Sequence, residues 1–281
     1  MKKQLMIIGI IVILLTVGLS GCTINKHKQT PNTQDEENVF SGLDSFYNVL
    51  ENSTDKNIVV VTHFPPIDDI VPSKKAIEPQ IDMDRCGSVV LWVYGHLHLT
   101  PFYDDSPSLV NYIDNISFVN CASIADSHYG DTPPTSFVMY ITKGSKNVTI
   151  KYRNHETETW LDSYVFDFDY VFNRSTTIWF YSDVHIDDEE YNVFRDVISE
   201  MNRNVVLDYS FCAGDLTYDC SSCGYLFNEQ FKEILAKNYY VLGNHDVSLG
   251  NGNWTLFPKD YYVDIGNLRI ICMSPTYEYN Y

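Results

Sequence analysis

Five short clusters of histidine, aspartate and asparagine directly follow apolar runs of the chain, where they could act as ligands for a metal ion. They are His63, Gly95-His96-Leu97-His98, Asp183-Val184-His185, Gly214-Asp215 and Gly243-Asn244-His245-Asp246. Each cluster by itself would also suit an ordinary turn. Five of the chain's eight histidines lie in these clusters, however, and chance does not explain that concentration. Mixed imidazole, carboxylate and amide donors suit Mn, Fe or Zn, so the sequence predicts a metal site.

The apolar runs before these clusters predict the strands that would position them. Short apolar runs alternate with amphipathic stretches, which is the pattern of an α/β protein. The runs predict strands at 58–62, 89–94, 118–121, 137–142, 148–152, 177–181, 211–213, 239–242, 261–265 and 268–273, and the amphipathic stretches predict helices at 42–51, 189–201 and 226–237. Open α/β sheets bind ligands beyond the carboxyl ends of their strands, so we expect the clusters to converge on one crevice. The glycines before His96, Asp215 and Asn244 are expected to let the backbone turn sharply there.

The five clusters resemble the sequence blocks of the calcineurin-like metallophosphoesterases, which are D-x-H, G-D, G-N-H-D, H and G-H-x-H. The spacing of Asp183, Asp215 and Asn244 also resembles that of the family's early blocks. The order differs, because D-x-H comes first in the family, whereas here His63 and the G-H-x-H block precede Asp183. Placing residues 173–281 ahead of 39–172 restores the family order. The chain therefore resembles a circularly permuted member that is rejoined around residues 164–176.

This resemblance implies a fold and a metal centre. The fold would be an α/β sandwich of two mixed β-sheets flanked by helices, formed by one permuted domain over residues 39–281. Residues 39–172 would correspond to the family's C-terminal half, and 173–281 to its N-terminal half. Two divalent metal ions would be bound, one by Asp183, His185 and His98, the other by Asn244, His63 and His96, with Asp215 bridging both.

The implied reaction is hydrolysis of a phosphate ester, either a monoester or a diester. Water activated between the metals would attack phosphorus in line with the leaving group. His245 would stabilise or protonate the leaving-group oxygen, and Asp246 would orient that imidazole. Tyr218 stands three residues after Asp215, as does a metal-bound tyrosine in purple acid phosphatases. Those enzymes lack a histidine in the first block, where this chain has His185, so we expect a packed or solvent-facing Tyr218.

The N-terminus carries the features of an export signal. Lys2 and Lys3 precede an apolar run at 5–17, which is shorter than the ~20 residues that span a bilayer. The following Leu19-Ser20-Gly21-Cys22 resembles the lipobox of prokaryotic lipoproteins, in which the cysteine is lipidated. We therefore expect a signal peptide at 1–21, a polar tether at 22–38 and a lipid-anchored protein outside the cytoplasm. An uncleaved apolar anchor is the alternative and gives the same location.

The charge of the chain bears on its partners. Lys and Arg number 19 and Asp and Glu number 37, which gives a net charge of -18 and disfavours nucleic acid as a partner. Removal of Lys2 and Lys3 with the signal peptide would give -20, because two positive charges are lost. Such a surface repels anionic headgroups, so membrane attachment would depend on the lipid at Cys22.

Three alternatives remain open at this point. The first is a surface-anchored lipoprotein that binds a metal or another ligand without catalysis, which leaves no role for His245 as a leaving-group acid. The second is a nuclease of the same superfamily, which the charge and the export signal disfavour. The third is a swapped dimer in which each half-domain is completed by a second chain, rather than a permuted monomer. The loops carry no motif that identifies the substrate.

The cysteines beyond Cys22 divide into two kinds. Cys121 and Cys272 lie in apolar strand-like runs and are expected to be buried free thiols. Cys220 and Cys223 lie in a predicted loop, where an oxidising compartment would allow a disulfide.

Overall fold

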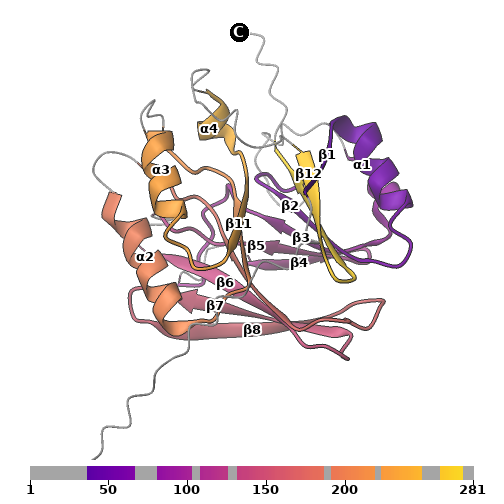
Figure 1. Cartoon of the computed structure of the whole chain (residues 1–281), viewed down its shortest axis with the longest axis horizontal. Coiled ribbons are helices and arrows are strands. Elements are labelled where there is room, and N and C mark those ends of the chain that lie inside the picture. Colours follow the sequence, from indigo (N-terminus) through magenta and orange to yellow (C-terminus); the bar gives the residue numbers. More distant parts are fainter. Residues whose placement is uncertain are drawn as a thin grey trace, which may run out of the picture. The chain divides into compact units, whose positions relative to one another are not determined.

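Two mixed β-sheets form the framework of the protein. The computed structural model describes residues 37–66, 81–102, 108–125, 132–186, 191–218, 223–248 and 260–274 (Figure 1), and all of them belong to one compact unit. The predicted signal peptide and most of the predicted tether therefore lie outside the described residues. None of the helices within the described ranges is long and apolar enough to cross a membrane.

The first sheet has seven strands and joins segments from both ends of the chain. In sheet order they are β1 (Glu37–Phe40), β12 (Asp260–Ile265), β13 (Leu268–Met273), β2 (Asn57–Thr62), β3 (Val89–Tyr94), β5 (Ile116–Asn120) and β4 (Val110–Ile113). The four strands from β13 to β5 are parallel, whereas the strands at both edges pair antiparallel. The carboxyl ends of the parallel strands therefore meet at one edge of the sheet.

The second sheet has six strands with the same division into parallel and antiparallel parts. In sheet order they are β11 (Lys237–Val241), β10 (Tyr209–Ala213), β9 (Thr176–Tyr181), β6 (Thr135–Ile141), β7 (Asn147–Asn154) and β8 (Thr159–Asp167). Strands β9, β10 and β11 run parallel, and β6, β7 and β8 form an antiparallel meander beside them. This sheet also collects the carboxyl ends of its parallel strands at one edge.

The apolar side chains explain why the sheets stack. Val59 and Val61 of β2 pack in one core cluster with Phe137 and Phe180 of the second sheet. Ile58 and other β2 side chains of the opposite face pack beneath the helix α1 (Gly42–Glu51). Because both faces of β2 are buried, its sequence is a continuous apolar run rather than an alternating one.

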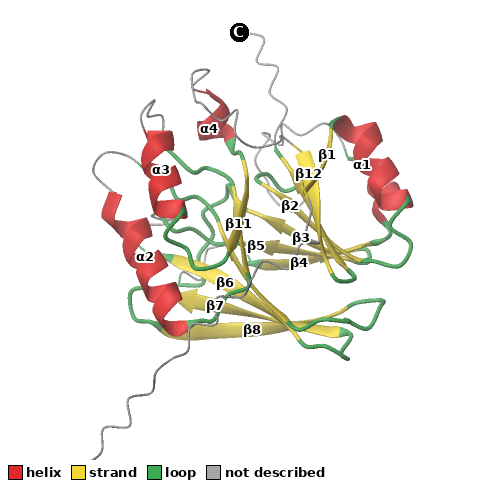
Figure 2. Ribbon diagram, in the orientation of Figure 1, coloured by secondary structure: helices red, strands yellow, loops and turns green. Residues whose placement is uncertain are grey.

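Helices cover the outer faces of the sandwich (Figure 2). The helix α1 places Phe46, Tyr47 and Leu50 on one face, which packs against the first sheet. The helices α2 (Tyr191–Asn204) and α3 (Cys223–Phe231) pack on the second sheet around Trp179. A 3₁₀ helix, η2 (Met83–Cys86), precedes β3, and a short helix, α4 (Asn244–Ser248), follows β11. The structure is the predicted α/β fold with two mixed sheets and flanking helices.

Most predicted elements are present, with end points shifted by a few residues. The prediction of a helix over 226–237 is wrong at its end, because α3 ends at Phe231 and Lys237 already begins β11. The intervening turn is held by Asn202, whose side-chain oxygen accepts the Leu235 amide at 2.9 Å. The sequence analysis missed β1, β4, β8, η2 and α4. Strand β8 is an edge strand with mostly exposed side chains, and its apolar residues form two short runs, 160–161 and 164–166, rather than one continuous run or an alternation. It extends to Asp167, which shortens the predicted rejoining segment.

The cysteines whose side chains the structure describes are free thiols. Cys86, Cys121, Cys212 and Cys272 are buried free thiols there, which confirms the prediction for Cys121 and Cys272. Cys220 and Cys223, between which an oxidising compartment would allow a disulfide, lie outside the described side chains.

A buried polar network joins the second sheet to α2, and we call it the β6–α2 network. Its members are Ser136 of β6, Arg153 of β7, His155, Trp179 of β9 and Glu200 of α2. His155 contacts Ser136 Oγ through Nε2 at 2.7 Å and Glu200 Oε2 through Nδ1 at 2.8 Å. Arg153 Nε donates to Glu200 Oε1 at 3.1 Å, and Trp179 Nε1 donates to Ser136 Oγ at 2.7 Å. The network thus ties α2 to three strands.

Candidate metal centre

The predicted site residues gather where the parallel strands of both sheets end. His63 follows β2, the 95–98 segment follows β3, and the 183–185 segment follows β9. Asp215 follows β10, and Asn244 is the first residue of α4 after β11. The expected convergence of the five clusters is therefore present within one chain.

The first group consists of His98, Asp183 and His185, all of which are buried. The Nε2 atom of His98 lies 3.2 Å from Asp183 Oδ1 and 3.0 Å from His185 Nε2. His185 Nε2 lies 3.9 Å from the same Asp183 oxygen. The three side chains thus direct one ligand atom each toward a common point.

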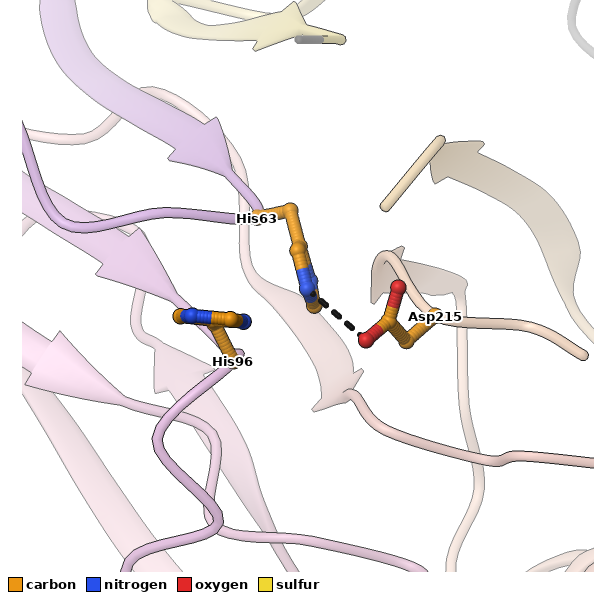
Figure 3. A group of neighbouring side chains, drawn as sticks. All are labelled: His63, His96 and Asp215. Carbon is orange, nitrogen blue, oxygen red and sulfur yellow. Dashed lines mark ion pairs between the residues drawn. The ribbon is translucent and has the colours of Figure 1, made fainter. Parts of the chain in front are cut away.

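The second group consists of His63, His96 and Asp215 (Figure 3), and Asn244 contacts His63. His63 Nε2 lies 3.1 Å from Asp215 Oδ2 and 3.1 Å from Asn244 Oδ1. The other ring nitrogen, Nδ1, donates to the Ala213 carbonyl oxygen at 2.8 Å. This hydrogen bond leaves Nε2 facing Asp215 and Asn244, as a ligating imidazole requires.

Asp215 lies between the two groups. Its Oδ2 atom is 3.1 Å from His63 Nε2 and 3.7 Å from His185 Nε2, so one oxygen faces a histidine of each group. Its Oδ1 atom accepts the backbone N–H of His245 at 3.0 Å. The carboxylate therefore occupies a position from which it could contact two ions.

One comparison with known proteins found a family model that matches part of the chain. Residues 176–277 match the family model of the calcineurin-like phosphoesterases. This segment runs from β9 past β13 and includes Asp183, His185, Asp215 and Asn244, but it is less than half of the chain. Neither the curated proteins nor the solved structures that were compared gave a match.

The family match supports the metallophosphoesterase superfamily for this chain, and its members are generally metal-dependent hydrolases. His63, His96 and His98 precede the matched segment in the sequence. Only the tertiary structure places them against Asp183 and Asp215, which the match includes.

The donor set fits divalent metal ions. Nitrogen and oxygen ligands bind such ions at about 2.0 to 2.2 Å, which separates neighbouring ligand atoms by roughly 3 to 3.6 Å. The separations of 3.0, 3.1 and 3.2 Å between neighbouring ligand atoms of the two groups lie in that range. His185 Nδ1 is buried without a hydrogen-bond partner among the described residues. His98 and His185 also direct nitrogens at each other, an arrangement that a shared cation would satisfy.

The electrostatics of the metal-free protein favour neutral ligands at two positions. Burial lowers the pKa of His96 to about 4 and the pKa of His185 to about 4, so both rings carry a free lone pair at neutral pH. For His63, burial also opposes the charged form, but the Asp215 carboxylate outweighs it and raises the pKa to about 10. Burial opposes ionisation of Asp183, yet the neighbouring His98 lowers its pKa below the usual value.

The backbone is strained at the same residues. Five site residues have a left-handed φ, between 45° and 65°, and they are His96, His98, Asp183, His185 and Asp215. Residues other than glycine seldom adopt this conformation, which costs free energy and is concentrated at functional sites. The fold therefore holds these side chains in place against their local preference.

The glycines that precede the clusters serve two purposes. Gly214 has a φ of +91°, and a Cβ there would lie 2.6 Å from His63 Nδ1. Gly95 and Gly243 have no such φ, but a Cβ at either position would collide with Ser182 or Asp215. The predicted sharp turn therefore applies to Gly214, whereas Gly95 and Gly243 are required because neighbouring groups approach too closely for a side chain.

His245 and Asp246 have different surroundings. The His245 ring lies 5.0 Å from the His185 ring, centroid to centroid, and one of its nitrogens lies within 4.8 Å of ligand atoms of His185 and Asp215. Asp246 is buried, and its carboxylate accepts backbone N–H groups of Leu216 and Gly243 at 3.0 and 2.8 Å. Asp246 thus ties α4 to the Asp215 loop, and its predicted role in orienting the imidazole stays a prediction. Burial and the nearby Asp215 raise the pKa of Asp246 to about 7.

Two residues near the site carry contacts that the sequence analysis did not predict. Ser123 Oγ lies 3.5 Å from His98 Nδ1 and donates to the Asp183 carbonyl oxygen at 3.3 Å. Its position just beyond β5 was the only available sequence signal. Tyr218 is 52% exposed and packs its ring against both His185 and His245, so it is at once solvent-facing and packed.

Proposed function

We propose that this protein hydrolyses phosphate esters, monoesters or diesters, by means of water activated at two divalent metal ions. The observation that carries the proposal is the position of Asp215. One of its oxygens faces His63 of one group and His185 of the other. A single carboxylate placed between two sets of nitrogen and oxygen donors is what a two-metal phosphoesterase requires.

The ligands divide between two ions in this proposal. Asp183, His185 and His98 would hold one ion, and Asn244, His63 and His96 would hold the other, with Asp215 contacting both. Mn, Fe and Zn suit this donor set. The chemistry that such ions supply when bound is neutralisation of phosphoryl oxygens and deprotonation of water near neutral pH.

His245 would act on the leaving group. It is outside both proposed ligand sets, yet its ring is 5.0 Å from that of His185. Protonated, its imidazole would give a proton to the departing ester oxygen as the bond from phosphorus breaks in line with the attacking water. We therefore propose His245 as the general acid.

The proposed function is tested with the purified full-length protein and an aryl phosphate ester. Activity is expected only after addition of Mn, Fe or Zn, and a chelator should abolish it. Asp215→Asn should lose metal and about 10³-fold in turnover, because one ligand would serve both ions. The control is Asp162→Asn, the same change on the exposed face of β8.

The outcomes separate the alternatives. Full activity of Asp215→Asn, or of the chelated protein, would exclude the two-metal mechanism. Two bound metals per chain without hydrolysis of any monoester or diester would favour the non-catalytic binding protein.

We also propose that the domain is a circular permutation of the family order. Asp260 supports this, because it contacts both sides of the proposed cut. Its Oδ1 accepts the N–H of Ser274, just after β13, and its Oδ2 accepts the N–H of Gly42, the first residue of α1. In the family order, a strand resembling β13 leads directly into a helix resembling α1. A short linker could therefore restore that order.

The permutation predicts a monomer in which one chain completes the site. In the described structure, His98 and Asp183 of a single chain lie 3.2 Å apart. A chain that joins 173–281 through a Gly/Ser linker to 39–172 should fold and keep the same substrate preference. If mixing His98→Ala with Asp183→Ala proteins restores activity, the swapped dimer is favoured instead.

The location of the protein is a separate proposal. We infer an extracytoplasmic protein held at the membrane by a lipid on Cys22, which lies outside the described residues. The lipobox-like Leu19-Ser20-Gly21-Cys22 supports it. Cys22→Ser should release the protein from the membrane fraction, and unchanged membrane association would favour an uncleaved anchor.

A further inference from the structure

Tyr218 forms a ring stack with the proposed general acid. Its ring centroid lies 5.0 Å from that of His245, with only 27° between the ring planes. From this geometry we propose that Tyr218 is a positioning residue, which holds the His245 imidazole at the angle that proton transfer to the leaving group needs. The inference rests on the proposed function and adds a residue to it.

The three rings at this place contact one another. The His245 ring lies 5.0 Å from the His185 ring with 73° between the planes, so these two rings meet edge to face, whereas the Tyr218 ring stacks on His245. Tyr218 in turn lies 5.5 Å from His185. Two neighbours at different angles restrict both rotation and tilt of the imidazole, whereas one neighbour would leave it free to turn.

The backbones that carry the two stacked rings are held by the same carboxylate. Asp246, the next residue after His245, accepts the N–H of Thr217 at 3.1 Å and its hydroxyl at 3.3 Å. Thr217 directly precedes Tyr218, whose own N–H donates to the Ile186 carbonyl oxygen at 3.2 Å. The stack is therefore organised before substrate arrives, which is the condition for efficient proton transfer.

The stack requires the ring of Tyr218 and not its hydroxyl. Tyr218→Phe keeps the ring and should leave metal content and turnover within about 2-fold of the unchanged protein. Tyr218→Leu removes the ring and should retain two metals per chain. Removal of an aromatic contact of this kind should lower turnover about 10-fold.

The test compares two esters in the metal-loaded protein. Phenyl phosphate has a poor leaving group and depends on the acid, whereas p-nitrophenyl phosphate has a good one and depends on it less. Tyr218→Leu should lose about 10-fold on phenyl phosphate and clearly less on p-nitrophenyl phosphate. In the double variant with His245→Ala, the Tyr218→Leu change should cost nothing further, because its effect acts through His245.

A second measurement does not depend on activity. In the metal-free protein, the tyrosine ring current should shift the imidazole C–H proton resonances of His245. That shift should disappear in Tyr218→Leu and persist in Tyr218→Phe.

The outcomes distinguish this inference from the proposed function. An equal loss on both esters, an additive double variant or the absence of the ring-current shift would overturn the positioning role alone. Loss of metal from Tyr218→Phe would show that the hydroxyl is a ligand and overturn it as well. If the unchanged protein with metal bound hydrolyses neither these two monoesters nor the corresponding phosphodiesters, the proposed function falls, and this role falls with it.

Discussion

Two buried clusters of histidine and carboxylate lie in this sandwich, and they differ in how their polar atoms are satisfied. In the β6–α2 network, both ring nitrogens of His155 have partners, Ser136 at 2.7 Å and Glu200 at 2.8 Å. In the metal centre, His98 and His185 point Nε2 atoms at each other, and His185 Nδ1 has no hydrogen-bond partner within the described structure. The first cluster is complete without a ligand, whereas the second is arranged for a cation.

The backbones of the two clusters differ in the same way. Ser136, Arg153, Trp179 and Glu200 lie in regular strands or in α2. Five residues of the metal centre instead have a left-handed φ. Residue type alone therefore does not mark a functional site. A functional site is marked by ligand atoms that face one another on a strained backbone. A fold retains the free-energy cost of that strain only where another interaction offsets it.

The largest expected effect comes from replacing a histidine of each cluster with alanine. His185→Ala should lose metal and about 10³-fold in turnover, because the proposed mechanism uses this histidine as a ligand of a water-activating ion. His155→Ala should retain metal and most activity but lose about 2 to 4 kcal/mol in the free energy of unfolding, since the buried Ser136 Oγ and Glu200 Oε2 each lose their contact with His155. Metal analysis and urea unfolding measure the two quantities. Similar metal loss in both variants would contradict the comparison.

A second change removes the charge of the β6–α2 network. Glu200→Gln should cost about 3 kcal/mol of unfolding free energy, because Arg153 then keeps a buried charge without its ion-pair partner. Metal stoichiometry should not change. Glu156→Gln, an exposed neighbour of His155, is the control and should be within about 0.5 kcal/mol of the unchanged protein. A metal loss in Glu200→Gln would mean that the two clusters are coupled.

A third change tests the close packing at the metal centre. Gly214→Ala places a Cβ 2.6 Å from His63 Nδ1 at a φ of +91°. It should lower the free energy of unfolding by about 2 kcal/mol and weaken metal binding. Gly144→Ala is the matched control, because its φ is +87° but nothing lies within 4 Å of the added Cβ. This control should lower the free energy of unfolding by about 1 kcal/mol and leave metal binding intact. Equal metal loss in both variants would exclude the steric explanation.

The smallest expected effect is a dependence of stability on pH. Burial opposes ionisation of Glu200, but hydrogen bonds from His155, Arg153 and Asn204 outweigh it and lower its pKa from 4.5 to about 2. A carboxyl group whose pKa is lowered by folding stabilises the folded state at pH values above the pKa that the group has in the unfolded chain. This contribution disappears as the pH falls from about 4.5 toward 2. In metal-free protein, the difference in unfolding free energy between the unchanged chain and Glu200→Gln should shrink over that range. A constant difference would contradict the assignment.

Particular residues show how far sequence reasoning reaches here. The strand end points at Thr62, Tyr94 and Tyr181 match the predicted ones, because continuous apolar runs are buried on both faces of their strands. Strand β8 was missed, since an exposed edge strand needs no apolar alternation. The end of α3 was also missed, because the turn that follows it is held by a contact between Leu235 and Asn202 of α2, which spacing along the chain does not show.

The sequence by itself determined the types of the candidate ligand residues, their placement after buried strands, and the order of the five clusters, which differs from the family order. All three can be read from the pattern of residues along the chain. Only the tertiary structure decided which donor atoms meet. It directs Asp215 Oδ2 between two histidines, engages Asp246 with the backbone of a neighbouring loop and stacks Tyr218 on His245. These contacts join residues that are far apart in the chain or fix side-chain angles. Neither property is encoded in spacing, since both arise when the two sheets bring their strand ends together.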